Sequence, residues 1–292
     1  MNSFGRQKQE HIKKKLLEPN SYQKSYVAFL DLLGFKELCK NQLGCAEIKA
    51  IFDDIELLKY SYDNTLGYAI ISEKTRSEST FTVMSDSIII SAPKNDEGFV
   101  FILYLCSLIQ NMLLKSQNMI LLRGGITEGD FFKLENLTFG PALIEAYKLE
   151  NEVALYPRVI IHRNVIEDLK QREVMRNERE LAKNSMSKYT VVDYMNHSDN
   201  YSSQISLFVT ESKDDKQYFV DYLNSLELLC LSQQNGKIEL IKNGIVKGCR
   251  EENDRHRKKY EWLLKYYNEK MSNNFFPDMQ KYLIELESKN DE

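Results

Sequence analysis

Between residues 26 and 161 the sequence alternates short apolar runs with longer helical periodicities, and this order restricts the fold more than any other feature. The run from Tyr26 to Asp31 is short and apolar enough for a buried strand, and residues 35–62 follow with helical spacing. A polar loop is expected over 72–79. Two β-rich runs then meet at Ser85-Asp86-Ser87, which predicts a hairpin with Asp86 near its tip.

The next elements complete this pattern. Residues 97–116 predict a core helix, because the run is too short and too polar to span a bilayer. Residues 119–132 predict a strand whose glycines indicate bulges or close backbone approach. A helix over 142–150, with Pro141 in its first turn, and a strand over 158–161 follow. The order is βαββαβ, which predicts an α+β fold of ferredoxin-like, palm type with a mostly antiparallel sheet.

The remaining chain carries weaker patterns. Residues 189–194 and 205–210 are candidate strands, and residues 214–222 predict a turn followed by a strand. From about residue 237 charged helix formers dominate, and the basic run 255–259 is expected to be a solvated helix face. The expected division is a lead-in over 1–24, a main domain over 25–230 and a helical C-terminal extension over 231–292.

Composition and missing motifs narrow the class of function. The formal charge of −4 and pI of about 5.8 give no positive field for nucleic acid or an anionic membrane. Five scattered cysteines match no zinc spacing, so free thiols in a reducing cytoplasm are expected. No apolar leader for secretion is seen near the start. The four histidines form no metal pair, and no nucleophile elbow, Walker A or dinucleotide-binding motif occurs.

Two carboxylates stand where predicted strands end. In a βαββ sheet the first two strands can be neighbours, which would bring Asp31 and Asp86 to one edge. Carboxylates of this kind suit Mg²⁺ or Mn²⁺, and two such ions can activate a hydroxyl and neutralise a leaving pyrophosphate. The alternative is that Asp86 is a turn residue and Asp31 a helix cap. Spacing alone does not separate the two interpretations.

Four motifs occur in the order known from the class III nucleotide cyclases. FLDLLGF, at 29–35, resembles their first metal motif, and SD, at 85–86, resembles the second. RGGI, at 123–126, with a glycine at 129, resembles their arginine-bearing strand. FG, at 139–140, resembles the pair that opens their transition-state helix. The spellings SDSIIIS, RGGITEG and FGPALIEAYKLE resemble most the pyrimidine cyclases of bacterial Pycsar anti-phage systems.

This resemblance implies roles for particular residues. Asp31 and Asp86 would hold two Mg²⁺ or Mn²⁺ ions, with the Leu32 carbonyl as a further ligand. Arg123 and Lys148 would offset phosphate charge during catalysis. The implied substrate-binding residues are Leu32, Leu33, Gly34, Phe35, Thr82, Arg123 and Leu137. From the residues alone, Arg123 is equally well interpreted as a strand arginine paired with Glu128 or Asp130.

The resemblance also implies partners. The substrate would be a nucleoside triphosphate, and the site would form at a head-to-tail homodimer interface. A separate cyclic-nucleotide-sensing effector would respond to the product, and neither nucleic acid nor membrane is an expected partner. The protein would act in the cytoplasm.

Three positions depart from the purine cyclases. Thr82 and Leu137 stand where those enzymes read adenine or guanine, which favours a smaller base and cCMP or cUMP as product. Ile144 replaces the asparagine of the transition-state helix. On the same helix Tyr147 is expected in the core, and Glu145 and Glu150 on a solvated face. A purine cyclase with a rearranged pocket, another palm-type nucleotidyltransferase and a non-catalytic binding or dimerising module stay open.

Overall fold

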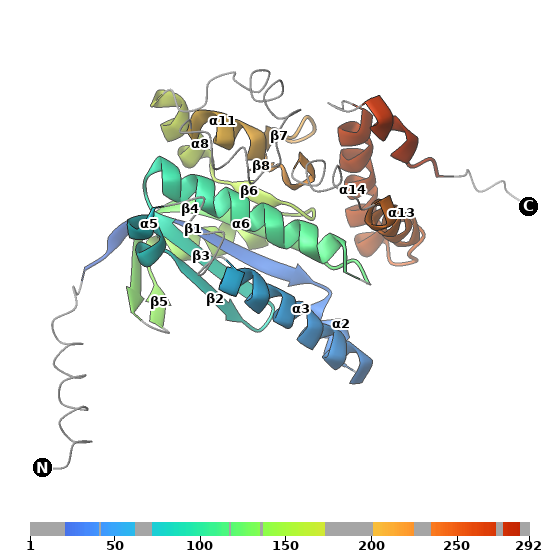
Figure 1. Cartoon of the computed structure of the whole chain (residues 1–292), viewed down its shortest axis with the longest axis horizontal. Coiled ribbons are helices and arrows are strands. Elements are labelled where there is room, and N and C mark those ends of the chain that lie inside the picture. The colour runs from blue at the N-terminus through green and yellow to red at the C-terminus, as the bar shows by residue number, and fades with distance from the viewer. Residues whose placement is uncertain are drawn as a thin grey trace, which may run out of the picture.

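The fold is mixed α+β, with an eight-stranded and mostly antiparallel sheet (Figure 1). The strand order is β2-β3-β1-β4-β6-β8-β7, and β5 pairs with β4 off this path. This confirms the predicted α+β class, while the cyclase-like palm stays a prediction. The computed structural model describes residues 21–40, 42–61, 72–116, 118–134, 137–172, 201–224, 235–272 and 277–286.

The central strand is β1 (Gln23–Leu33), which lies between β3 (Ser87–Pro93) and β4 (Leu121–Leu134) and is antiparallel to both. The predicted hairpin forms, because β2 (Thr80–Met84) pairs with β3. β1 runs two residues past Asp31, since its pairing with β4 continues to Leu33. The first strand meets the hairpin as expected, but its neighbour is β3 and not β2, so the expected pairing of the first two strands is wrong.

The rest of the sheet continues from β4. The parallel pair is β4 with β6 (Val159–Ile161). Beyond it β8 (Tyr218–Val220) and β7 (Val209–Glu211) are antiparallel, so the predicted turn and strand over 214–222 are confirmed.

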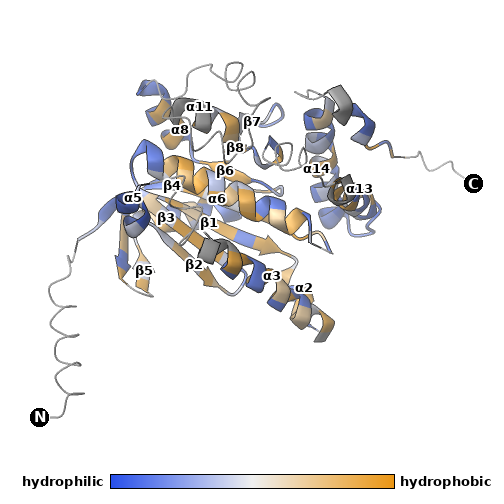
Figure 2. Ribbon diagram, viewed as in Figure 1, coloured by the Kyte–Doolittle hydropathy of each residue, from blue (hydrophilic) through white to orange (hydrophobic). Residues whose placement is uncertain are grey.

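The helix α6 (Asp96–Leu114) covers one face of the sheet, and its apolar residues meet apolar strands (Figure 2). The side chain of Asn95 caps its first turn by accepting a hydrogen bond from the Gly98 N–H. Among the described helices only α6 is long and apolar enough to cross a membrane, and 83% of that window is buried inside the protein. This burial is typical of the core helix of a soluble protein, as the sequence predicts.

The opposite face of the sheet carries α7 (Pro141–Lys148). Ala142 and Ala146 of α7 pack against Val27 and other residues of the strands, so small side chains bring this helix close to the backbone. A Cβ added to Gly125 would lie 2.6 Å from the Ala146 carbonyl oxygen, which explains the glycine in β4. A π-helical turn, Leu149–Val153, continues α7 past residue 150, where the helix was predicted to end.

The C-terminal extension is helical as predicted, with α13 (Asn235–Cys249) and α14 (Asp254–Ser272) side by side in Figure 1. A second apolar cluster joins these helices to Leu121 of β4 and Phe219 of β8. A 3₁₀ turn, Pro277–Tyr282, packs on α14. The extension therefore shares a core with the end of the sheet, and the proposed boundary near residue 230 stays a prediction.

Several predicted elements differ from the structure. The expected loop over 72–79 contains α5 (Glu73–Glu78), capped by the Ser72 side chain. The expected helix over 35–62 is divided into α2 (Phe35–Leu38) and α3 (Gln42–Ser61). β5 (Leu137–Phe139) was not expected as a strand.

The candidate strand over 205–210 is wrong for most of its length. Residues Tyr201–Phe208 form the helix α11, which packs on α6. The run Ile-Ser-Leu-Phe-Val is compatible with a helix or a strand, and packing on α6 favours the helix over most of it. The candidate strand over 189–194 and residues 1–20 of the lead-in lie outside the described residues.

Candidate functional site

The structure brings Asp31 and Asp86 together at one edge of the sheet. Asp31 lies in β1 opposite Ser87 of β3, and Asp86 precedes Ser87 in the hairpin turn. The Leu32 N–H donates a hydrogen bond of 2.9 Å to the Asp86 carbonyl, which ties the turn to β1. Burial raises the pKa of Asp31, Arg123 lowers it and the charge of Asp86 raises it further. The two carboxylates are therefore electrostatically coupled.

Arg123 faces these carboxylates from β4. It pairs in register with Asp31, and its Nε lies 3.6 Å from the Asp31 Oδ2. The same Nε lies 2.5 Å from the Glu150 Oε1, although the two atoms are not aligned as a hydrogen bond. The alternative partners of Arg123 are excluded, because Glu128 pairs with Lys94 and Asp130 pairs with Lys24.

Glu150 is the residue of this site that the sequence interpretation missed. It is 3% exposed, so its predicted place on a solvated helix face is wrong. The reason is visible in the spacing: Ala142, Ala146 and Glu150 recur every four residues and share the face that packs on the sheet. That spacing was the available signal. Glu145 is exposed as predicted.

The site gathers three acidic side chains, those of Asp31, Asp86 and Glu150. Burial raises the pKa of Glu150 to about 7, Arg123 opposes this shift, and Asp31 and Asp86 add to it. Arg123 thus pairs with two carboxylates, those of Asp31 and Glu150, and the charge of Asp86 acts on both. Among the described residues no three His, Cys, Asp or Glu side chains surround one point as a complete metal cage. Asp31 and Asp86 match the donor set of an ion that takes its other ligands from water and phosphate.

The segment after Asp31 turns sharply. Leu32 is buried and Leu33 joins the C-terminal apolar cluster. Gly34 adopts a left-handed conformation, with φ of 86°, and leads into α2, where Phe35 packs on Phe52 of α3. The four residues that the resemblance assigns to substrate binding here, 32–35, thus directly follow Asp31 in the chain and lie at the same end of β1.

The other predicted site residues lie elsewhere. Thr82 is partly buried in β2, opposite Ile89. Leu137 is 55% exposed on β5. Lys148 is exposed at the end of α7 and bonds to Glu145 at 2.8 Å. The contacts of the described residues bring none of these three to Asp31 or Asp86 within the chain.

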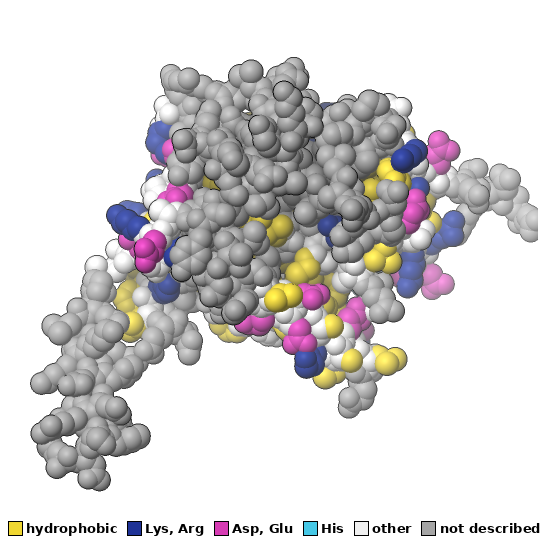
Figure 3. All heavy atoms as spheres, viewed as in Figure 1, with side chains coloured by type: hydrophobic (Ala, Val, Ile, Leu, Met, Phe, Trp, Pro, Cys, Tyr) yellow, Lys and Arg dark blue, Asp and Glu magenta, His cyan; other side chains and the backbone are white. Residues whose placement is uncertain are grey.

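An exposed apolar surface flanks α7. Ile144 is 56% exposed and Tyr147 is 50% exposed, so the predicted core position of Tyr147 is wrong. Its ring instead lies edge-on to Phe29 of β1, with 5.3 Å between ring centroids. We call these two exposed residues of α7 the α7 surface; Leu137 and Phe139 of β5, which precedes α7 in the chain, are exposed as well. On the other side of the molecule, Figure 3 shows apolar and acidic side chains mixed around α2 and α3.

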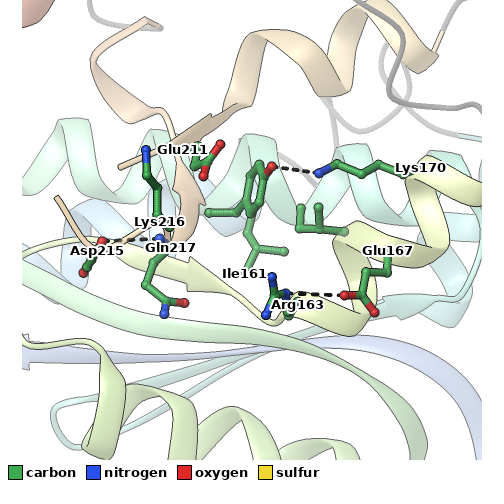
Figure 4. A pocket seen from close by; sticks show the side chains of 10 residues that line it. Ile161, Arg163, Glu167, Lys170, Glu211, Asp215, Lys216 and Gln217 are labelled. Carbon is green, nitrogen blue, oxygen red and sulfur yellow. Dashed lines mark hydrogen bonds and ion pairs between the residues drawn. The ribbon is translucent and has the colours of Figure 1, made fainter. Parts of the chain in front are cut away.

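A separate pocket lies at the β6–β8 side of the sheet (Figure 4). It is a cavity of about 320 Å³ lined mainly by charged side chains. Lys170 donates to the Tyr218 hydroxyl at 2.8 Å, and Arg163 pairs with Glu167 at 3.4 Å. These basic groups have partners within the pocket, which therefore gives no sign of a missing ligand.

Comparison with known proteins adds no relative. A scan of protein-family models finds none that matches this chain, and a search of curated proteins finds no match either.

Proposed function

We propose that this protein is a metal-dependent nucleotide cyclase that converts CTP or UTP into the 3′,5′-cyclic monophosphate and pyrophosphate. One observation carries the proposal: Asp31 of β1 pairs with Ser87 of β3, so it lies beside Asp86 in the hairpin turn, and Arg123 is directly opposite Asp31. The same three residues are the ones that the resemblance to class III cyclases assigns to metal and phosphate. The central antiparallel strands are compatible with the cyclase-like palm that we propose for the main domain.

The donor set supports binding of two Mg²⁺ or Mn²⁺ ions by Asp31 and Asp86, with the Leu32 carbonyl as a further ligand. Ions of this kind, when bound, lower the pKa of an attacking hydroxyl and offset the charge of a leaving pyrophosphate. The residues of the chain orient the substrate around them. Arg123 would contact the triphosphate, and the buried Glu150 would hold the guanidinium in place.

The base-reading positions support a pyrimidine. Thr82 is partly buried and offers a single hydroxyl, and Leu137 offers no hydrogen bond. Neither residue matches the charged or polar side chains that read the base in the purine cyclases. The expected product is therefore cCMP or cUMP.

The α7 surface supports a head-to-tail homodimer. Lys148 lies at one end of α7 and pairs with Glu145 of its own helix rather than with Asp31. In a head-to-tail pair, Lys148 of one chain would reach the carboxylates of the other, and the α7 surface would be covered. By resemblance the protein would act in the cytoplasm during phage infection, and its product would activate a separate effector.

Product identification tests this proposal. Wild type and Asp86→Ala are each incubated in Mn²⁺ with CTP, UTP, ATP or GTP in separate reactions. The products are separated by chromatography and identified by mass spectrometry. Asp214→Ala serves as the control, since Asp214 pairs with Lys265 at the surface. We expect a cyclic pyrimidine nucleotide from wild type and control, and none from Asp86→Ala. Cyclic purine or linear products would favour the alternative enzymes, and equal inactivity of all variants would favour a non-catalytic module.

A further inference from the structure

The C-terminal helix α14 brings a lysine to the candidate site. Lys259 lies close enough to Arg123 and Asp31 for their charges to act on it. It also lines a cavity of about 150 Å³ with Leu33 and Gly34, which directly follow the carboxylate strand end. His256 and Tyr260 of the same helix complete that side of the cavity. Residues that closely follow Asp31 in the chain and residues of the C-terminal extension therefore line one cavity.

Lys259 occupies the buried face of α14, although it belongs to a basic run predicted to be solvated. Leu263 and Tyr267 follow it at intervals of four residues, and both are fully buried. Tyr260 is held against α13, where a Cβ at Gly248 would lie 2.1 Å from its ring. The position of the lysine on the helix is thus fixed by core packing.

No acidic side chain of the described residues pairs directly with Lys259, although the charge of Asp31 acts on it at longer range. Among the described residues Lys259 makes no hydrogen bond or ion pair, whereas its neighbour Lys258 is exposed and pairs with Asp254 at 2.7 Å. Burial lowers the pKa of Lys259, the guanidiniums of Arg123 and Arg255 lower it further, and Asp31 opposes them. A partly buried ammonium group beside two guanidiniums is costly unless an anion joins them.

We propose that Lys259 binds the β- and γ-phosphates of the nucleoside triphosphate, and the pyrophosphate formed from them. This inference rests on the proposed function, because it assigns the phosphate tail of the same substrate. A triphosphate whose α-phosphate lies at Asp31 and Asp86 would extend past Leu33 and Gly34 into the cavity under Lys259. The C-terminal extension would then be part of the substrate site and not only a packing element.

Binding of inorganic pyrophosphate in the presence of Mn²⁺, measured by calorimetry on the full chain, tests the inference. We expect Lys259→Met to bind about 10- to 100-fold more weakly than wild type, because a charge-assisted contact to phosphate is lost. Lys259→Arg should retain most of the affinity. Lys258→Met, on the exposed side of the same turn, should bind like wild type. Equal melting temperatures of the variants would show that folding is intact.

The outcomes separate the inference from the proposed function. Loss of pyrophosphate binding in Lys259→Met supports the inference, whether or not a cyclic product forms. The inference is overturned if wild type is an active cyclase and Lys259→Met keeps the same pyrophosphate binding and the same KM. That result would leave the proposed function intact. Absence of pyrophosphate binding by wild type would overturn it as well.

Discussion

Asp31 and Arg123 face each other across the β1–β4 pair, with 3.6 Å between the Asp31 Oδ2 and the Arg123 Nε. Arg123 is shared, since its Nε is closer to Glu150 than to Asp31. Asp31 is therefore only partly neutralised, and Asp86 adds a second negative charge beside it. This arrangement leaves carboxylate charge available at the sheet edge, which is what a divalent cation requires.

Asp31→Asn should abolish turnover while the fold is kept. The amide is nearly isosteric but supplies a much poorer metal ligand, so we expect at least a ~10³-fold loss of activity if metal ions carry the chemistry. Stability should not fall, because burial disfavours the ionised form of Asp31. Product formation and the melting temperature are measured together. Asp130→Asn is the control, and comparable losses in both variants would argue against the assignment.

The stability of the metal-free protein should depend on pH through Glu150. Its pKa is raised from 4.5 to about 7, so the folded state binds this proton more tightly than the unfolded chain does. The free energy of unfolding should therefore fall as pH rises from about 4.5 to about 7. Glu150→Gln removes this contribution, and at pH 8 it should be more stable than wild type by about 1–3 kcal/mol.

Denaturant unfolding with a chelator at pH 5 and pH 8 measures the effect of Glu150→Gln. The matched variant is Glu145→Gln, which changes an exposed carboxylate on the same helix. If the free energy of unfolding of Glu150→Gln depends on pH as strongly as that of wild type, the prediction is contradicted.

Ile144→Asp should weaken the proposed homodimer. Ile144 is 56% exposed on α7, and a carboxylate there would oppose burial of the α7 surface against a second copy. Light scattering coupled to size exclusion should show a shift from dimer to monomer. Leu57→Asp, at an equally exposed position of α3, should leave the dimer intact. A wild-type protein that is monomeric at every concentration would refute the homodimer.

Gly125→Ala should destabilise the packing of α7 on the sheet. The new Cβ would lie 2.6 Å from the Ala146 carbonyl oxygen and 2.8 Å from the Leu149 Cβ, so the helix must shift. We expect a loss of about 1–3 kcal/mol in denaturant unfolding. Gly34→Ala is the informative comparison, because nothing lies within 4 Å of its Cβ but its φ is 86°. Its cost should be about 1 kcal/mol.

The sequence predicts the sheet well where its signals are local. The run ending at Asp31 is short and apolar, the hairpin around Asp86 joins two β-rich runs through turn residues, and both elements form. The two carboxylates meet because β1 pairs with β3, whereas the sequence interpretation expected the first two strands to be neighbours. α11 shows the limit, since its apolar run suits helix or strand and only packing on α6 separates them.

Other parts of the candidate site depend on contacts distant in sequence. Glu150 is buried because α7 lies on Gly125, and Lys259 reaches the site because α14 packs on the end of the sheet. Within its own helix, each of these two charged residues is predicted to lie on a solvated face. A charged residue in register with buried residues, such as Ala146 or Leu263 four positions away, is the sequence signal that identifies both.

The bond from the Leu32 N–H to the Asp86 carbonyl has a consequence for energetics. It ties the hairpin turn to β1 next to the β1–β3 pairs, so the backbones that carry the two acidic side chains cannot separate without breaking backbone hydrogen bonds. Folding thus holds like charges together, and a divalent cation would release that electrostatic strain. The melting temperature should then rise with the concentration of Mn²⁺, even in a variant that performs no chemistry.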